Sequence, residues 1–183
     1  MDKNVIKQII LNQQDFIGRI KLQSRDVCFE ENAHYVLVGI RRAGKSYMLY
    51  QHIQHLVANG HSIEEMLFIN FEDERISDIR KEDLYLILEA YRELFAFQPI
   101  IFLDEIQNVE GWEHFARRLA DEKYRVFITG SNAHMLSREI SSTLGGRYLT
   151  KEIRPFSFSE YLEYHNIHLP QHWELSPIRV DVV

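Results

Sequence analysis

This sequence of 183 residues is poor in the features that mark several large classes of protein. Its single cysteine, Cys28, cannot form a disulfide within the chain, and its N-terminus lacks the apolar run and small-residue cleavage site of a signal peptide. No stretch approaches the roughly 20 uninterrupted apolar residues that would cross a bilayer. We therefore expect a soluble protein of the reducing cytoplasm that has no membrane partner.

Basic residues are also in the minority, with 21 Lys and Arg against 27 Asp and Glu, which gives a net charge of −6. This balance argues against a broad basic surface that binds the nucleic-acid backbone, although a local basic patch would be compatible with it. The histidines at positions 34, 52, 55 and 61 lack a convincing metal-ligand arrangement. Composition therefore leaves a DNA partner open and gives no support to a histidine metal site.

The chain is long enough for one compact domain, with 45% hydrophobic residues and no repeats or internal linker. Apolar residues at spacings near three and four predict an N-terminal segment, 1–33, of one or two amphipathic helices packed on the core. We expect the main domain to span residues 34–165. The signals fade after this point, and residues 166–183 are expected to form an irregular, truncated tail.

Short apolar runs alternate with helical spacing through the main domain. The alternation predicts an α/β fold in which a parallel sheet is covered on both faces, with ligands at the carboxyl ends of the strands. Helices are expected from Lys45, Leu84, Trp112 and Ser157, the last because Ser157 and Glu160 form a capping box. The five expected strands cover residues 35–38, 67–71, 100–103, 125–129 and 148–153.

Residues 39–46, Gly-Ile-Arg-Arg-Ala-Gly-Lys-Ser, match the phosphate-loop pattern G-x-x-x-x-G-K-[ST] between an expected strand and an expected helix. Glycines let the backbone wrap closely around phosphate oxygens, and the N–H groups that begin the helix favour an anion. Lys45 should bridge the β- and γ-phosphates, and the Ser46 hydroxyl should bind Mg²⁺. The pattern therefore predicts ATP and Mg²⁺ as ligands.

Two adjacent carboxylates, Asp104 and Glu105, end the apolar strand 100–103 at the edge of the sheet where the phosphate loop should also lie. Asp104 is expected to hold Mg²⁺, and Glu105 to orient and polarise the water that attacks the γ-phosphate. An ordinary solvated strand end is the alternative. The pair also favours hydrolysis over phosphoryl transfer to a small acceptor.

Other polar residues near the strand ends are weaker candidates. Ser131 or Asn132 could contact the γ-phosphate or the water, or could simply cap the next helix. Asn70 interrupts an apolar strand, and it could hydrogen-bond Glu105 or satisfy a loop backbone group instead. Arg147 could reach the γ-phosphate of a neighbouring subunit, with an intrachain ion pair as the alternative. Arg41 and Arg42 are expected to be exposed or to face a partner.

Four segments carry a resemblance to the AAA+ superfamily, most closely to predicted ATPases of bacteria and archaea that have an uncharacterised C-terminal domain. They are GIRRAGKS, IIFLDEIQ, FITGSN and LGGRYLTKEIRPFSFSEYL, within roughly residues 34–162. The resemblance implies a P-loop NTPase three-layer sandwich with strand order 5-1-4-3-2, and it places the segment before Tyr35 near adenine. The nucleotide-contacting residues it implies are Gly39, Ile40, Arg41, Arg42, Ala43, Gly44, Lys45, Ser46 and Tyr47.

The resemblance also assigns roles outside the loop. Asp104 and Glu105 correspond to the Walker B pair, Ser131 or Asn132 to sensor 1, Asn70 to the glutamate switch, and Arg147 to the arginine finger. Similar proteins continue into a helical lid and a C-terminal domain. We therefore expect this chain to be a fragment that can form a homo-oligomer, and whose protein or DNA partner binds through the missing part.

Three functions compete at this stage. The leading one is an ATPase that couples hydrolysis to conformational change, because the paired carboxylates suit water activation. The second is a STAND-like signalling or defence switch that binds ATP tightly and hydrolyses it rarely. The third is a small-molecule kinase, which would need an acceptor pocket and a mobile lid that the sequence does not reveal.

Overall fold

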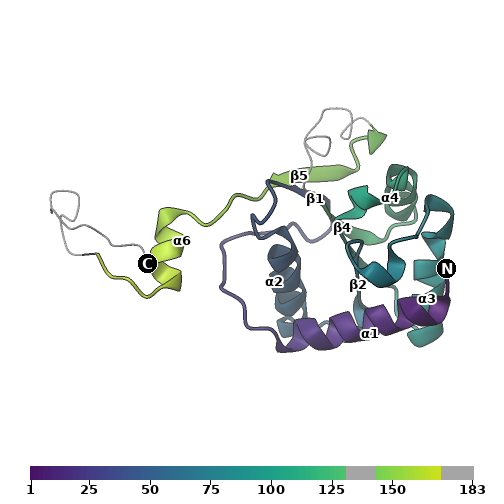
Figure 1. The fold of residues 1–183 in the computed structure, drawn as a ribbon, viewed down its shortest axis with the longest axis horizontal. Coiled ribbons are helices and arrows are strands. Elements are labelled where there is room, and N and C mark those ends of the chain that lie inside the picture. Colours follow the sequence, from purple (N-terminus) through teal and green to yellow (C-terminus); the bar gives the residue numbers. More distant parts are fainter. Residues whose placement is uncertain (131–142, 170–183) are drawn as a thin grey trace.

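The computed structural model describes residues 1–130 and 143–169, and within these residues the strands form one five-stranded parallel sheet (Figure 1). The strand order β2-β3-β4-β1-β5 is the predicted order 5-1-4-3-2 read from the opposite edge, so the predicted fold class is confirmed. All four pairings are parallel. The strands are β1 (His34–Val38), β2 (Met66–Asn70), β3 (Ile100–Asp104), β4 (Arg125–Gly130) and β5 (Tyr148–Glu152).

The helices begin close to the positions that the sequence predicts. They are α1 (Lys3–Arg19), α2 (Lys45–Ala58), α3 (Tyr85–Leu94), α4 (Trp112–Asp121) and α6 (Phe158–Tyr164). Short 3₁₀ turns cover Ile63–Glu65, Glu74–Ile76, Lys81–Asp83 and Ile106–Asn108. The capping box at the start of α6 is present, with Ser157 and Glu160 bonded reciprocally. In the described part of the chain, no helix has both the length and the apolar character needed to span a bilayer.

Two hydrophobic clusters, one on each face of the sheet, make the fold a three-layer sandwich. Alternate residues of the strands point to opposite faces, so Val36 and Val38 pack with α3 and α4. Tyr35 and Leu37 pack with α2 on the other face. The strands are therefore buried on both sides, as expected for a parallel sheet.

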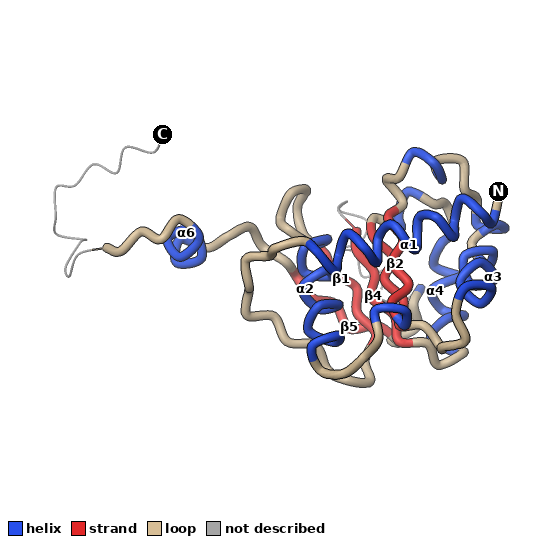
Figure 2. The backbone as a smooth tube through the Cα atoms, turned by 90° about the horizontal axis from the view of Figure 1, so that it is seen from below, coloured by secondary structure: helices blue, strands red, loops and turns tan. Residues whose placement is uncertain are grey.

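Helix α1 crosses the edge of the sheet at β2 (Figure 2). Its residues Ile6, Ile9 and Ile10 join one hydrophobic cluster, whereas Ile17 joins the other. The buried Gln14 amide donates a hydrogen bond of 2.9 Å to the Met66 carbonyl of the edge strand. Helix α1 thus packs on the edge strand and joins both hydrophobic clusters.

The N-terminal segment, 1–33, was expected to be helical, and its helix ends at Arg19. Ile20 already has an extended backbone, with φ −66° and ψ 134°, and residues 20–33 contain no helix or strand. Residues 21–25 alternate in direction instead, because Lys21, Gln23 and Arg25 line one cavity whereas Leu22 and Ser24 line another. A period of two is typical of extended chain, not of helix.

Helix α6 stands apart from the sheet, at the end of an extended segment that follows β5 (Figures 1 and 2). None of its residues is buried. Of the predicted irregular tail 166–183, residues 166–169 are irregular, and the remainder lies outside the described residues.

Candidate functional site

The loop of residues 39–46 joins β1 to α2, and its two glycines have conformations that other residues adopt poorly. Gly39 has φ +156°, and a Cβ atom there would lie 2.2 Å from the Ile153 carbonyl oxygen. Gly44 has φ +91° and directly precedes Lys45, the first residue of α2. Without a side-chain cap at Gly44, the first N–H groups of α2 remain oriented toward the loop, as in sites that bind phosphate.

Lys45 is the central cation of this loop. It is only 4% exposed, and its Nζ donates hydrogen bonds to the carbonyls of Gly39, at 3.3 Å, and Ile40, at 3.2 Å. The same Nζ lies 3.5 Å from Oε1 of Glu105. The sheet therefore brings the predicted phosphate lysine and the predicted water-activating glutamate into contact.

Asp104 ends β3 and is almost completely buried, with 1% of its surface exposed. The Thr129 hydroxyl donates a hydrogen bond of 2.6 Å to Asp104 Oδ1. Burial raises the pKa of Asp104 from 3.8 to about 6, against the hydrogen bonds of Thr129 and Ser46, which lower it. A buried carboxylate of this kind gains from a nearby cation.

Glu105 follows Asp104 in a left-handed backbone conformation, with φ 54° and ψ 41°. Its N–H donates to the Thr129 hydroxyl at 2.9 Å, and its Oε2 accepts a hydrogen bond of 2.6 Å from the Gln107 amide. A non-glycine residue in this region costs about 1–3 kcal/mol, and such residues are concentrated at functional sites. The conformation turns the carboxylate toward Lys45.

The residues at the end of β3 and the start of α2 fit a magnesium ion. Mg²⁺ prefers oxygen ligands, typically one or two from the protein together with phosphate oxygens and water. The Ser46 hydroxyl and the Asp104 carboxylate supply such oxygens, and the hydroxyl lies close enough to lower the pKa of Asp104. They are the residues that would hold the ion.

A cleft of about 820 Å³ opens over the loop, and it is large enough for a nucleotide. Its walls include Tyr47, Glu105 and residues Lys21, Gln23 and Arg25 of the N-terminal segment. Arg41 and Arg42 lie at its exposed rim, as predicted. The N-terminal segment thus lies beside the cleft, where adenine was expected.

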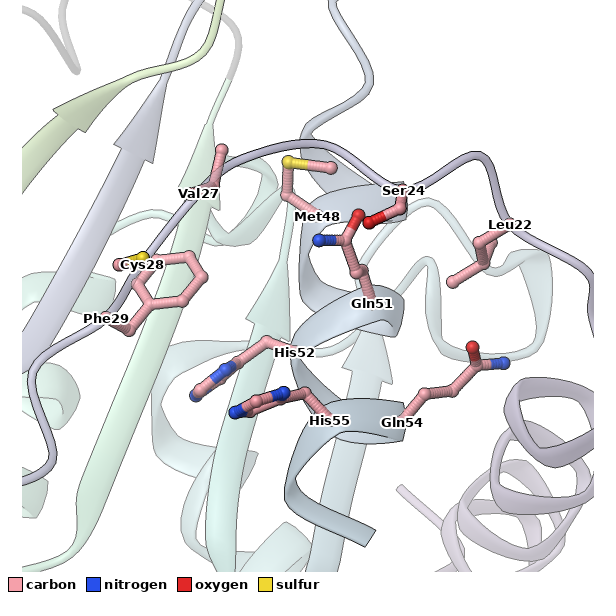
Figure 3. A pocket seen from close by; sticks show the side chains of 10 residues that line it. All are labelled: Leu22, Ser24, Val27, Cys28, Phe29, Met48, Gln51, His52, Gln54 and His55. Carbon is pink, nitrogen blue, oxygen red and sulfur yellow. The ribbon is translucent and has the colours of Figure 1, made fainter. Parts of the chain in front are cut away.

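A second cavity of about 520 Å³ lies behind that segment, against α2 (Figure 3). The side chains that line this cavity from α2 include Gln51, His52 and His55. Ser24 and Cys28 line it from the N-terminal segment. His52 is buried among aromatic rings, and this burial lowers its pKa to about 3. The imidazole is therefore neutral. Residues 21–25 form the wall between the two cavities.

The weaker candidates have different positions. Asn70 is the last residue of β2, and its Oδ1 accepts a hydrogen bond of 2.8 Å from the Glu72 N–H, so it satisfies a loop backbone group. Arg147 precedes β5, and its Nε lies 2.6 Å from Asp121 Oδ1. This is the intrachain ion pair that the sequence offered as the alternative to an arginine finger. Arg147 lies at the amino ends of the strands, opposite the phosphate loop. Ser131 and Asn132 lie outside the described residues.

Sequence reasoning missed three residues of the site: Thr129, Gln107 and Arg25. Thr129 bridges Asp104 and Glu105 from β4, and the signal for it was a polar residue at the end of an apolar strand. Gln107 holds Glu105 from the turn that follows it. No sequence pattern indicated Arg25, because its approach to the loop depends on the path of residues 20–33.

Together, the parallel sheet, the glycine loop before α2 and the buried Lys45, Asp104 and Glu105 define a P-loop nucleotide-binding protein of the ATPase type. The chain belongs to the AAA domain family, which it matches over residues 31–162. This finding confirms the resemblance drawn from the motifs.

Curated relatives share much of the sequence. An uncharacterized protein of Methanocaldococcus jannaschii is 35% identical over 176 residues, which cover 94% of this chain and 38% of that protein. One from Haemophilus influenzae is 32% identical over 164 residues, covering 88% and 40%. The chain thus spans about two fifths of their length. Among solved structures, Cdc6p from Pyrobaculum aerophilum is similar at 17% identity and a TM-score of 0.47, covering 91% of this chain and 53% of that one.

Proposed function

We propose that this chain binds ATP with Mg²⁺ and hydrolyses it to ADP and phosphate, and that hydrolysis drives a conformational change. The observation that carries the proposal is the convergence of Lys45, Asp104 and Glu105 at the phosphate loop, with Lys45 Nζ 3.5 Å from Glu105 Oε1. A cation, a metal-binding carboxylate and a second carboxylate beside it are the groups that hydrolysis of a γ-phosphate needs.

Each residue has a role in this proposal. The N–H groups at the start of α2 bind phosphate oxygens, and Lys45 turns from the loop carbonyls to the β- and γ-phosphates. Ser46 and Asp104 would hold Mg²⁺, which would neutralise phosphate charge. Glu105 accepts a hydrogen bond from the attacking water and polarises it. Thr129 fixes both carboxylate residues by bonding Asp104 Oδ1 and the Glu105 N–H.

Residues outside this group enter as further proposals. Arg147 acts on the nucleotide of a neighbouring copy in a homo-oligomer, for which it must exchange its ion pair with Asp121. Asn70, released from the Glu72 N–H, contacts Glu105 as a switch. Ser131 or Asn132 contacts the γ-phosphate. The curated relatives are more than twice as long as the part that this chain matches, and we propose that a protein or DNA partner binds the additional part.

The test is ATP binding and phosphate release with Mg²⁺, measured at several protein concentrations for the wild-type chain, Lys45→Ala and Glu105→Gln. We expect Lys45→Ala to lose binding, because the phosphate charge is no longer compensated. Glu105→Gln should bind but not turn over. Turnover that rises with protein concentration would support Arg147 acting in trans, and Arg147→Ala should abolish that rise. A phosphorylated metabolite in place of free phosphate would overturn hydrolysis in favour of a kinase.

One observation favours the second candidate, a slow STAND-like switch. Both oxygens of Glu105 are engaged within the chain, by Lys45 at 3.5 Å and by Gln107 at 2.6 Å. A carboxylate held in this way must change partners before it can polarise water. Single-turnover kinetics separate the candidates, because a switch would retain bound ATP for many minutes whereas an ATPase would release phosphate within seconds.

A further inference from the structure

Arg25 lies in the wall between the two cavities and reaches the phosphate loop from outside its sequence. Its Nη1 donates a hydrogen bond of 3.3 Å to the Ala43 carbonyl, and a Cβ atom built on Gly44 would lie 3.8 Å from the same nitrogen. The side chain is 11% exposed and lines the cleft that contains Lys45 and Ser46. A guanidinium group is thus placed where the phosphates of a bound nucleotide would approach it.

The backbone of Arg25 is fixed from the opposite side. The Gln51 amide accepts a hydrogen bond of 2.9 Å from the Arg25 N–H and donates one of 2.7 Å to the Arg25 carbonyl. Figure 3 shows Gln51 reaching from α2 toward this segment. Because the backbone is anchored to α2, the Arg25 side chain can change partners without moving the segment.

The Arg25 side chain also pairs with Glu160 of α6. Arg25 Nε donates to Glu160 Oε1 at 2.7 Å, Nη2 donates to Oε2 at 3.4 Å, and the guanidinium carbon lies 5.3 Å from the centre of the Phe156 ring. The pKa of Glu160 falls to about 2, chiefly because of the Arg25 hydrogen bond. No residue of α6 is buried, and this ion pair is one of the contacts that join the helix to the core.

We infer that Arg25 is a phosphate-contacting residue that exchanges Glu160 for the bound nucleotide and thereby releases α6. The inference rests on the proposed function and extends it to the route by which nucleotide reaches the C-terminal helix. Phosphate oxygens and a carboxylate make the same bidentate pair with a guanidinium, so the two acceptors compete. Because ATP keeps a larger net negative charge than the single carboxylate of Glu160 even with Mg²⁺ bound, the competition favours the nucleotide.

Affinity measurements separate this exchange from a merely structural tie. Arg25→Ala should weaken binding of Mg²⁺-ATP about tenfold, the effect of one charge-assisted hydrogen bond. Glu160→Gln should tighten binding about threefold, because the competitor loses its charge. In the Arg25→Ala background, Glu160→Gln should then have no effect. Arg25→Lys should recover part of the affinity, since the charge is restored.

The exposed pair of Arg154 and Glu152, at 3.1 Å, provides a matched control, and Glu152→Gln should leave the affinity for ATP unchanged. If Arg25 were only structural, Glu160→Gln would weaken binding or leave it unchanged. If Glu160 acted through long-range electrostatic repulsion of the nucleotide, Glu160→Gln would still tighten binding in the absence of Arg25. Either result overturns the inference while the proposed function stands. No ATP binding by the wild-type chain would overturn both.

The release of α6 can be measured directly, because the chain has one cysteine. With Cys28→Ser, spin labels at the exposed positions Ala58 on α2 and Glu163 on α6 report the distance between the two helices. We expect Mg²⁺-ATP to broaden the distance distribution, and Arg25→Ala to broaden it without ATP. A distribution that ATP leaves unchanged, under conditions where ATP is bound, would overturn the inference.

Discussion

Thr129 allows a demanding test of how the site is built. Its side chain is completely buried, and its hydroxyl donates to Asp104 Oδ1 at 2.6 Å and accepts from the Glu105 N–H at 2.9 Å. Thr129→Val keeps the shape but leaves a buried carboxylate without this donor and a buried N–H without this acceptor. Each loss costs about 1–3 kcal/mol, so we expect the free energy of unfolding to fall by about 3 kcal/mol.

Urea denaturation followed by circular dichroism measures this loss. The slope of the unfolding free energy against urea concentration should not change. Thr129→Ser keeps the hydroxyl and should cost about 1 kcal/mol for the lost methyl group. Thr150→Val, at an exposed position of β5, should have little effect. Because the Thr129 hydrogen bond lowers the pKa of Asp104, the valine variant should lose more stability at pH 8 than at pH 5. A Thr129→Val variant as stable as the wild type at both pH values would refute this account of the site.

Three further outcomes are expected. The raised pKa of Asp104 means that its ionisation opposes folding, so the stability of the wild type relative to Asp104→Asn should fall by about 3 kcal/mol as pH rises from 3.8 to above 6, in denaturant titrations without Mg²⁺. A stability difference between the wild type and Asp104→Asn that does not change with pH would contradict this expectation. Gly39→Ala places a methyl group 2.2 Å from the Ile153 carbonyl, and should cost more than 2 kcal/mol in thermal unfolding and abolish ATP binding; normal binding would show that the loop tolerates the contact. Gln107→Ala removes one hydrogen bond to Glu105 Oε2 and should raise phosphate release several-fold, whereas slower release would mean that Gln107 positions the glutamate productively.

The fold could be predicted because its signals are local. Each strand is a short apolar run, and α2 and α4 show apolar residues at helical spacing, with Phe115, Ala116 and Leu119 inward as expected. The strand order came from the resemblance, since periodicity alone does not order parallel strands. Residues 20–33 were predicted poorly because their path is fixed by distant partners, among them Gln51 and Gln54 of α2.

The site was predictable for the residues that lie in two recognisable motifs, the phosphate loop and the acidic pair at a strand end. The placement of Lys45, Ser46, Asp104 and Glu105 follows from the rule that carboxyl ends of parallel strands share an edge. The hydrogen-bond partners do not follow from that rule, because they depend on ångström-scale distances. Asn70 bonds to a neighbouring N–H instead of Glu105, and Arg25 reaches the loop from 18 positions earlier in the chain than Ala43.

The position of α1 has a consequence for association between chains. An edge strand with unpaired backbone groups is a template on which another strand can add, and β2 is such an edge. Helix α1 covers it, and the Gln14 amide occupies the Met66 carbonyl. Detachment of this helix would therefore uncover a hydrophobic strand, Met-Leu-Phe-Ile-Asn, of the kind that starts intermolecular β-sheet growth. Helix α1, none of whose residues lines the cleft over the phosphate loop, thus keeps this edge strand covered.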